Sequence, residues 1–174
     1  GENNDPLNPF NENDITNPSD VYSLSKLKAE EKLYNLSKLN NIELTIIRPP
    51  LIYGPGVKGN FLKLIKLIHN NNFLPIDNEQ FRRSYLSTLN LSNAIDTIIN
   101  CNLDPVNTFF ISDDNDISLK DLSKNIAKCL NVRLRYIKIP DFFLKYFVKI
   151  FFKKTFFKLF SSFNINVYHF KNKT

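Results

Sequence analysis

Apolar residues recur at helical or strand spacing along most of this 174-residue chain, after an opening stretch that shows neither period. Residues 1–19 are rich in Asn, Asp and Pro, which is typical of a loop. From Ser19 or Asp20, either of which can cap a helix, apolar side chains at helical spacing predict a helix that ends near Asn40. Its apolar positions are Leu27, Ala29, Leu33, Leu36 and Leu39.

A short, largely apolar and β-branched run follows that helix, from Ile42 to Arg48, and Pro49-Pro50 stops it. Such a run suits a strand that is buried on both faces of a parallel sheet. Helix, loop and strand in this order make one half of a βαβ unit. A glycine-containing loop, Tyr53 to Gly59, comes next along the chain.

The rest of the chain alternates helices with short strands. An amphipathic helix is expected from about Asn60 to Asn70, with inward positions at Leu62, Ile65 and Ile68. Further strands are expected at 73–76, 83–86, 108–112 and 134–139, and further helices at 91–101, 118–130 and 141–163. Ser118 is expected to cap its helix, with Asp121 at the third helical position. This alternation predicts an α/β fold.

Composition and charge exclude several classes of protein. The hydrophobic content of 43% is that of a globular chain, and no apolar run is long enough to span a membrane. The net charge of +6 comes mainly from lysines, but no basic and aromatic groove pattern supports nucleic-acid binding. Cys101 and Cys129 lie far apart without metal-ligand spacing, which predicts reduced thiols that fill the core, a cytoplasmic setting and no metal site.

The helix expected at 141–163 carries many phenylalanines with lysines between them. The phenylalanines occupy more than one helix face, which is too many for a narrow core stripe. Plain packing explains them, and so does a helix that lies in a membrane interface. Both interpretations stay open on the sequence.

The clearest candidate chemistry is Tyr22, which is followed four residues later by Lys26. On a helix the two side chains leave the same face one turn apart. A lysine ammonium beside a tyrosine hydroxyl lowers the pKa of that hydroxyl from its ordinary value of about 10, which makes it a general acid/base near neutral pH. The same spacing also arises by chance on a solvated, lysine-rich helix face.

Further stretches accompany this pair in order along the chain: Ile46 to Gly56, Lys58 to Phe61, Arg82 to Leu86 and, more loosely, Thr108 to Asp113. Together they resemble the extended short-chain dehydrogenase/reductase superfamily, specifically its nucleotide-sugar epimerases and dehydratases. The similarity is greatest to the bacterial surface-polysaccharide branch. Members of that branch act on UDP-linked or lipid-diphosphate-linked N-acetylhexosamines.

The resemblance implies roles for residues around a nicotinamide cofactor, NAD or alternatively NADP. Tyr22 would remove the proton of the sugar 4-hydroxyl while hydride leaves C4 for NAD. Lys26 would lower the pKa of Tyr22 and bind the nicotinamide ribose. The backbone at Pro49 and Pro50 would lie against the nicotinamide end of the cofactor.

The resemblance also implies substrate contacts. Asn60 and Phe61 would meet the substrate diphosphate or uridine, because the start of a helix favours an anion. Arg83 would pair with the diphosphate, as guanidinium groups do. Tyr53 is expected to pack rather than to bind substrate, and Arg82 is expected to be a surface charge.

The implied fold is the C-terminal part of a Rossmann-type parallel sheet plus the small mixed α/β substrate-binding lobe. Residues 1–58 would be the remnant of the NAD-binding domain, and residues 59–174 the lobe. The four glycines stand at positions 1, 54, 56 and 59, so the family's Gly-x-x-Gly-x-x-Gly cofactor motif is absent from this sequence. We therefore expect the chain alone to bind NAD weakly or not at all and to aggregate, since its parallel strand would have unpaired edges.

Three functions remain open on these grounds. The first is an NAD-dependent 4-epimerase of a nucleotide-linked or lipid-linked hexosamine. As a full-length enzyme it could form a homodimer, and residues 141–163 could touch the inner face of the membrane. The second is an NAD(P)H-dependent C4 ketoreductase of a UDP-4-keto-6-deoxy-N-acetylhexosamine. The third is a non-catalytic remnant. Net NAD(P)H consumption with a 4-keto sugar would identify the reductase, and redox-neutral interconversion the epimerase.

Overall fold

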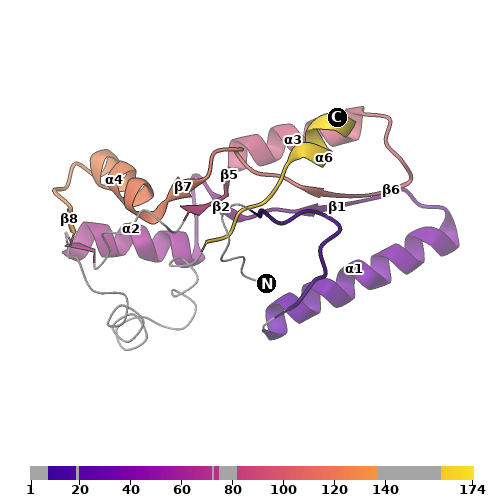
Figure 1. Cartoon of the computed structure of the whole chain (residues 1–174), viewed down its shortest axis with the longest axis horizontal. Coiled ribbons are helices and arrows are strands. Elements are labelled where there is room, and N and C mark those ends of the chain that lie inside the picture. Colours follow the sequence, from indigo (N-terminus) through magenta and orange to yellow (C-terminus); the bar gives the residue numbers. More distant parts are fainter. Residues whose placement is uncertain (1–7, 19, 72, 75–81, 137–161) are drawn as a thin grey trace.

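The computed structural model describes residues 8–18, 20–71, 73–74, 82–136 and 162–174, and it confirms an α/β fold (Figure 1). The elements are α1 (Val21–Asn40), β1 (Leu44–Arg48), β2 (Leu51–Tyr53), α2 (Gly59–Asn71), β3 (Phe73–Leu74), β4 (Arg82–Arg83), β5 (Tyr85–Ser87), α3 (Thr88–Asn100), β6 (Val106–Phe110), β7 (Ile117–Ser118), α4 (Leu119–Cys129), β8 (Arg135–Tyr136) and α6 (Tyr168–Lys173).

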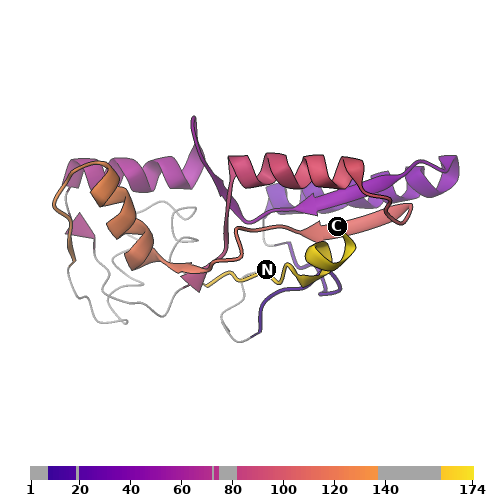
Figure 2. The same cartoon turned by 90° about the horizontal axis from the view of Figure 1, so that it is seen from above.

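The longest strand pair is β1 with β6, which run parallel from Leu44 opposite Val106 to Arg48 opposite Phe110. The pairs β2–β5 and β3–β8 are also parallel, whereas β4 and β7 are antiparallel. In Figure 1, α1 lies along one side of β1 and β6, with α3 and α6 along the other. Figure 2 shows α2 and α4 together at the opposite end of the molecule.

Among the described residues, two clusters of buried side chains make the core. The first joins α2, β3 and α4, and its members are Leu64, Ile68, Leu74, Leu119 and Ala127. The second joins β5, α3 and β6, and its members are Leu86, Ala94, Phe109 and Ile111. Helix α1 contributes to neither cluster, and its buried residue is Ser37.

Side-chain caps fix the helix starts that the sequence indicated. The Asp20 carboxylate accepts a hydrogen bond from the Ser23 backbone at 2.7 Å, and the Ser23 hydroxyl accepts one from the Asp20 backbone at 3.2 Å. Ser118 accepts from the Asp121 backbone at 3.0 Å, as predicted. Such caps satisfy backbone N–H groups that have no partner inside the helix.

Three expectations about burial and backbone were wrong. The inward residues of α2 are Phe61, Leu64 and Ile68, because the helix is rotated relative to the predicted face and leaves Leu62 and Ile65 only partly buried. Strand β1 is partly buried at every position rather than buried on both faces, since within the described residues it pairs with β6 alone. Cys129 is exposed and does not fill the core, although both cysteines are free as expected.

The predicted helix 141–163 lies outside the described residues up to position 161. Ser162 and Phe163 are described and are not helical. Phe163 instead pairs with the edge of β4: its N–H donates to the Arg82 carbonyl at 3.2 Å, and its carbonyl accepts from Ser84 at 2.9 Å. Among the helices that the structure describes, none has both the length and the apolar character needed to cross a bilayer.

Candidate functional site

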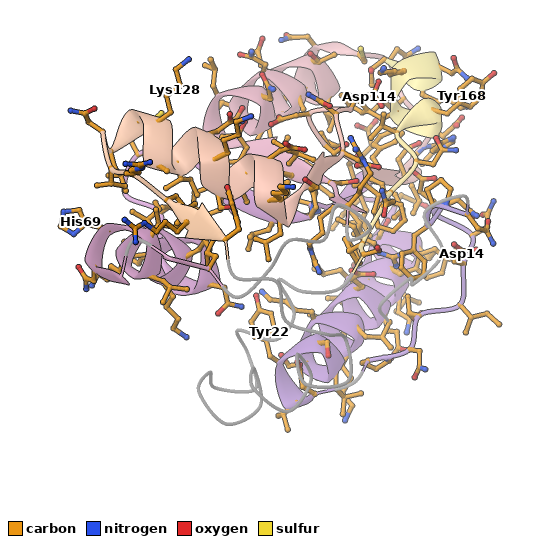
Figure 3. All side chains as sticks on the ribbon, turned by 60° about the vertical axis from the view of Figure 1, so that its left-hand side comes forward. Asp14, Tyr22, His69, Asp114, Lys128 and Tyr168 are labelled. Atoms are coloured by element: carbon orange, nitrogen blue, oxygen red, sulfur yellow. The ribbon has the colours of Figure 1, made fainter. Side chains whose placement is uncertain are left out.

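Tyr22 and Lys26 lie on the first turns of α1, at the end of the helix where Figure 3 labels Tyr22. The Lys26 ammonium nitrogen is 5.6 Å from the centroid of the Tyr22 ring, and both side chains are exposed. Both line a cavity of about 300 Å³ between the N-terminal segment, α1 and the ends of β1 and β6. A tyrosine hydroxyl that is open to a cavity can exchange a proton with a bound ligand.

The same spacing occurs a second time on α1, at Tyr34 and Lys38. There the ammonium nitrogen is even closer to the ring centroid, at 4.5 Å. Tyr34 also lines a cavity that includes Arg48, the last residue of β1, but Lys38 does not. What distinguishes the first pair is that both of its side chains line one cavity, which also includes Phe110, the last residue of β6. Ligands of open parallel sheets bind at these carboxyl ends of the strands.

An ion pair fixes this face of α1 to the carboxyl end of β1. The Arg48 guanidinium lies 2.5 Å from one Glu30 carboxylate oxygen through Nη2, and its Nε lies 3.1 and 3.3 Å from the two oxygens. Glu30 comes one helical turn after Lys26, so it stands on the same face of α1. Forked guanidinium–carboxylate contacts of this kind also fix orientation. Sequence reasoning missed the pair, although a charged residue that ends an apolar strand requires a partner.

The two prolines expected at the cofactor directly follow β1. Pro49 is exposed and Pro50 is partly buried, and neither lines the cavity that Tyr22 and Lys26 share. Their backbone nevertheless leaves the carboxyl end of the same strand that carries Arg48.

The residues expected at the substrate lie in the α2–α4 part of the molecule, and the structure does not bring them all to Tyr22. Phe61 is buried, stacks on Tyr53 at a centroid distance of 5.6 Å and meets Tyr85 edge-on at 6.4 Å. It lines a second, separate cavity. Asn60 precedes it on α2 and is partly buried.

Arg83 lies between these two places. Its guanidinium carbon is 5.3 Å from the centroid of the Phe163 ring, and Phe163 lines the cavity of Tyr22. Arg82 is exposed, and its guanidinium donates to the Asp116 carbonyl. Successive side chains of a strand point to opposite faces, so on β4 Arg82 lies at the surface and Arg83 lies beside the cavity wall.

Tyr53 packs and donates a hydrogen bond, which agrees with the expectation of a packing residue. Its hydroxyl donates to the Asp113 carboxylate at 2.7 Å. Burial, together with this hydrogen bond and the negative charge of Asp113, raises the pKa of Tyr53 to about 12. The hydroxyl thus stays protonated at neutral pH.

The described residues fit one end of a nicotinamide cofactor. Tyr22 and Lys26 offer a hydroxyl and an ammonium that suit a ribose diol. Gly54, Gly56 and Gly59 all have positive φ angles, and a side chain at Gly54 would come within 2.2 Å of Thr88. Among the described residues there is also no cluster of potential metal ligands.

Known proteins are similar to this chain in sequence or in fold. The profile of the family described as the NAD dependent epimerase/dehydratase family matches residues 1–109. A UDP-glucose 4-epimerase of Vibrio cholerae is 35% identical over 147 residues, which are 82% of this chain and 44% of that relative. The chain therefore spans less than half the length of that relative.

Solved structures of similar fold include an epimerase and a dehydratase. The UDP-glucose 4-epimerase of Thermotoga maritima, solved with UDP-glucose, has a TM-score of 0.71 at 17% identity, covering 99% of this chain and 52% of that one. The dTDP-glucose 4,6-dehydratase of Bacillus anthracis, solved with NAD, has a TM-score of 0.69 at 16% identity, covering 99% and 51%. At this identity the likeness concerns the fold, while the profile match over residues 1–109 establishes the family. The chain belongs to the NAD dependent epimerase/dehydratase family.

Proposed function

We propose that this chain carries the acid/base pair and substrate lobe of an NAD-dependent nucleotide-sugar 4-epimerase, with NADP as the alternative cofactor. The observation that carries the proposal is the position of Tyr22 and Lys26, one helical turn apart and open to a cavity at the carboxyl ends of β1 and β6. The substrate class we infer is a nucleotide-linked or lipid-diphosphate-linked N-acetylhexosamine used for surface polysaccharide.

In this proposal the chain moves one proton in each direction. The Tyr22 phenolate takes the proton of the sugar 4-hydroxyl, and after the ketone has turned in the site the Tyr22 hydroxyl returns it. The Lys26 ammonium stabilises the phenolate between these steps. NAD, when bound, would supply a reversible acceptor for the hydride of C4. Arg83 and the start of α2 at Asn60 hold the diphosphate.

A C4 ketoreductase would use the same Tyr22 and Lys26, and only its redox balance differs. The neighbouring folds include both an epimerase and a dehydratase, so the fold leaves the reaction open. A chain without catalytic function is the third outcome. The experiment must therefore read interconversion and net cofactor oxidation separately.

The test supplies this chain with a cofactor-binding half and measures both reactions. We would co-express it with the N-terminal half of the Vibrio cholerae relative and assay UDP-N-acetylglucosamine, UDP-glucose and a UDP-4-keto sugar. Epimerisation of a UDP-sugar without net NADH change supports the proposal. Steady NAD(P)H consumption with the 4-keto sugar would identify the reductase instead, and a stable complex inactive in both assays would support the remnant.

The Tyr22→Phe variant should lower kcat by about 10²–10⁴-fold, the usual contribution of a positioned acid/base. The matched control is Tyr34→Phe, because Tyr34 has the same spacing to a lysine on the same helix. Equal losses in the two variants would contradict the assignment of Tyr22.

A further inference from the structure

Two carboxylates are among the described residues that line the cavity of the proposed acid/base pair, and each has a partner of its own. The Asn11 backbone N–H donates to one Asp14 oxygen at 2.9 Å, and the Asn11 side-chain amide donates to the other at 3.1 Å. The Glu30 carboxylate accepts from the Arg48 guanidinium through contacts of 2.5, 3.1 and 3.3 Å. Within the described residues, neither carboxylate forms an ion pair with the lysine of the acid/base pair.

Glu30 is the carboxylate best placed to compete for Lys26. The two residues stand four positions apart on α1, a spacing that brings a lysine and a glutamate together on one helix face. The Glu30 side chain is only 25% exposed, and a carboxylate withdrawn from water in this way needs a partner. Among the described residues that line the two cavities bordered by Glu30, the cations are Arg48 and Lys26. Without Arg48, the partner of Glu30 would therefore be Lys26.

Lys26 stands between two possible partners on this face of α1. Tyr22 lies one helical turn before it and Glu30 one turn after it, so an ammonium that moves toward one leaves the other. In the structure the ammonium nitrogen lies 5.6 Å from the centroid of the Tyr22 ring. This is the position that the proposed chemistry needs, and it depends on Glu30 being paired with another group.

Arg48 is well suited to hold Glu30 against this competitor. Its guanidinium is planar and presents a fork of N–H donors that matches a carboxylate, whereas an ammonium is a point charge. The Arg48 side chain reaches Glu30 from the end of β1 and is only 23% exposed, so water competes little for the contact. Arg48 thus occupies the carboxylate that would otherwise draw the Lys26 ammonium away from Tyr22.

We propose that Arg48 is a positioning residue: by holding the Glu30 carboxylate, it keeps the Lys26 ammonium at Tyr22. The positions of the side chains follow from the contacts above, and the consequence for catalysis rests on the proposed function. This role differs from that of a tether between α1 and β1. A tether fails when either partner is removed, whereas the loss of Arg48 displaces Lys26 only while Glu30 remains to draw it away. Removing Glu30 as well should therefore return Lys26 to its place.

Nuclear magnetic resonance tests the position of Lys26 directly. In the full chain, alone or in the co-expressed complex, the nuclear Overhauser effect between the Lys26 ε protons and the Tyr22 ring protons is measured. This contact should be lost in Arg48→Met and return in Arg48→Met/Glu30→Gln, while the control Glu31→Gln should leave it unchanged. If Arg48→Met does not fold, Arg48→Gln replaces it, because its amide still donates to Glu30 without a charge. A contact that survives the loss of the Arg48 charge, or that stays absent in the double variant, would overturn the proposal.

The pH dependence of the reaction tests the catalytic consequence in the co-expressed complex. An opposite charge within roughly 4–6 Å favours an ionised group by about one to three pH units. Arg48→Met should therefore move the acidic limb of the kcat profile up by about one pH unit and lower kcat at neutral pH about 10-fold, and the double variant should restore most of both. Equal losses in the single and double variants would show that the pair acts only as a tether and would overturn the proposal. The expected Lys26 contacts in a complex without epimerase activity would overturn the proposed function and support the positioning role.

Discussion

Helices α1 and α2 both carry apolar residues at helical spacing, yet they are held in different ways. Helix α2 buries Leu64 and Ile68 against β3 and α4, and Phe61 against Tyr53 and Tyr85. On α1, Leu33 is 49% exposed and Leu39 is 80% exposed. The α2–α4 region thus has a core made by its own residues, whereas the helix with Tyr22 and Lys26 has few apolar contacts within the described part of the chain.

Polar contacts at two points hold α1 instead. Near its C-terminal end, the Ser37 hydroxyl donates to the Ile42 carbonyl at 2.5 Å, and the Ile42 N–H donates to the Ser37 carbonyl at 3.1 Å. Nearer the Tyr22 end, Glu30 pairs with Arg48. The buried core of α2 and α4 and the candidate chemistry of α1 therefore lie in different regions of this chain.

The largest effect is expected from truncating a buried leucine of α2. Leu64→Ala should lower the free energy of unfolding by about 2–5 kcal/mol, because it removes fully buried atoms and leaves a cavity. The matched change Leu33→Ala on α1 should cost less than about 0.5 kcal/mol, as exposed positions do. Urea unfolding followed by circular dichroism measures both, and similar losses would show that α1 is packed as well as α2.

The second effect is a loss of folding stability at alkaline pH, caused by the burial of the Tyr85 hydroxyl. Its folded pKa of about 12 lies above the ordinary value of 10.0, so the folded chain holds a proton that the unfolded chain releases first. The resulting stability is fully present below pH 10 and is lost as the pH rises toward 12. The loss should reach about 2 kcal/mol. Urea midpoints across this window should fall for the wild type and fall less steeply for Tyr85→Phe, and parallel curves would show that Tyr85 is open to solvent.

The third effect isolates the ion pair that orients α1. Glu30→Gln should cost about 1–2 kcal/mol, since it weakens a charged hydrogen bond between partly buried groups. Hydrogen exchange should then speed up in α1 and not in α2. Glu31→Gln, at the exposed neighbouring position, is the control and should change neither helix. A double-mutant cycle with Arg48→Met gives the coupling energy, and a coupling near zero would show that the pair does not hold α1.

Local sequence signals predicted the helices and the longer strands because the determinants are themselves local. Ser118 and Asp121 mark the start of α4, and the run from Ile42 to Arg48 marks β1. Strands of two residues, such as β4 and β7, carry no period, so only their pairing partners define them. Helix α6 was missed for a related reason, since it has six residues and no side-chain cap.

The candidate site was less predictable than the fold. The pair Tyr22–Lys26 has the same spacing as Tyr34–Lys38, and only the direction of α1 relative to β1 separates them. The contact of Glu30 with Arg48 spans 18 positions and depends on that same packing. The spacing of residues shows which side chains share a helix face. The tertiary structure decides which strand end that face contacts.

The smallest effect is expected at the exposed ion pair near the C-terminus. The Lys173 ammonium donates to the Asp104 carboxylate at 2.8 Å, and this hydrogen bond, with the positive charge, lowers the pKa of Asp104. The stability from the pair is therefore present at neutral pH and is lost only as the pH falls through that lowered pKa. Because both groups are exposed, Asp104→Asn should shift the urea midpoint less than any change above, and high salt should abolish the shift. A shift as large as that of Glu30→Gln, or one that persists at high salt, would show that exposed polar contacts hold α6 as firmly as the Glu30–Arg48 pair holds α1.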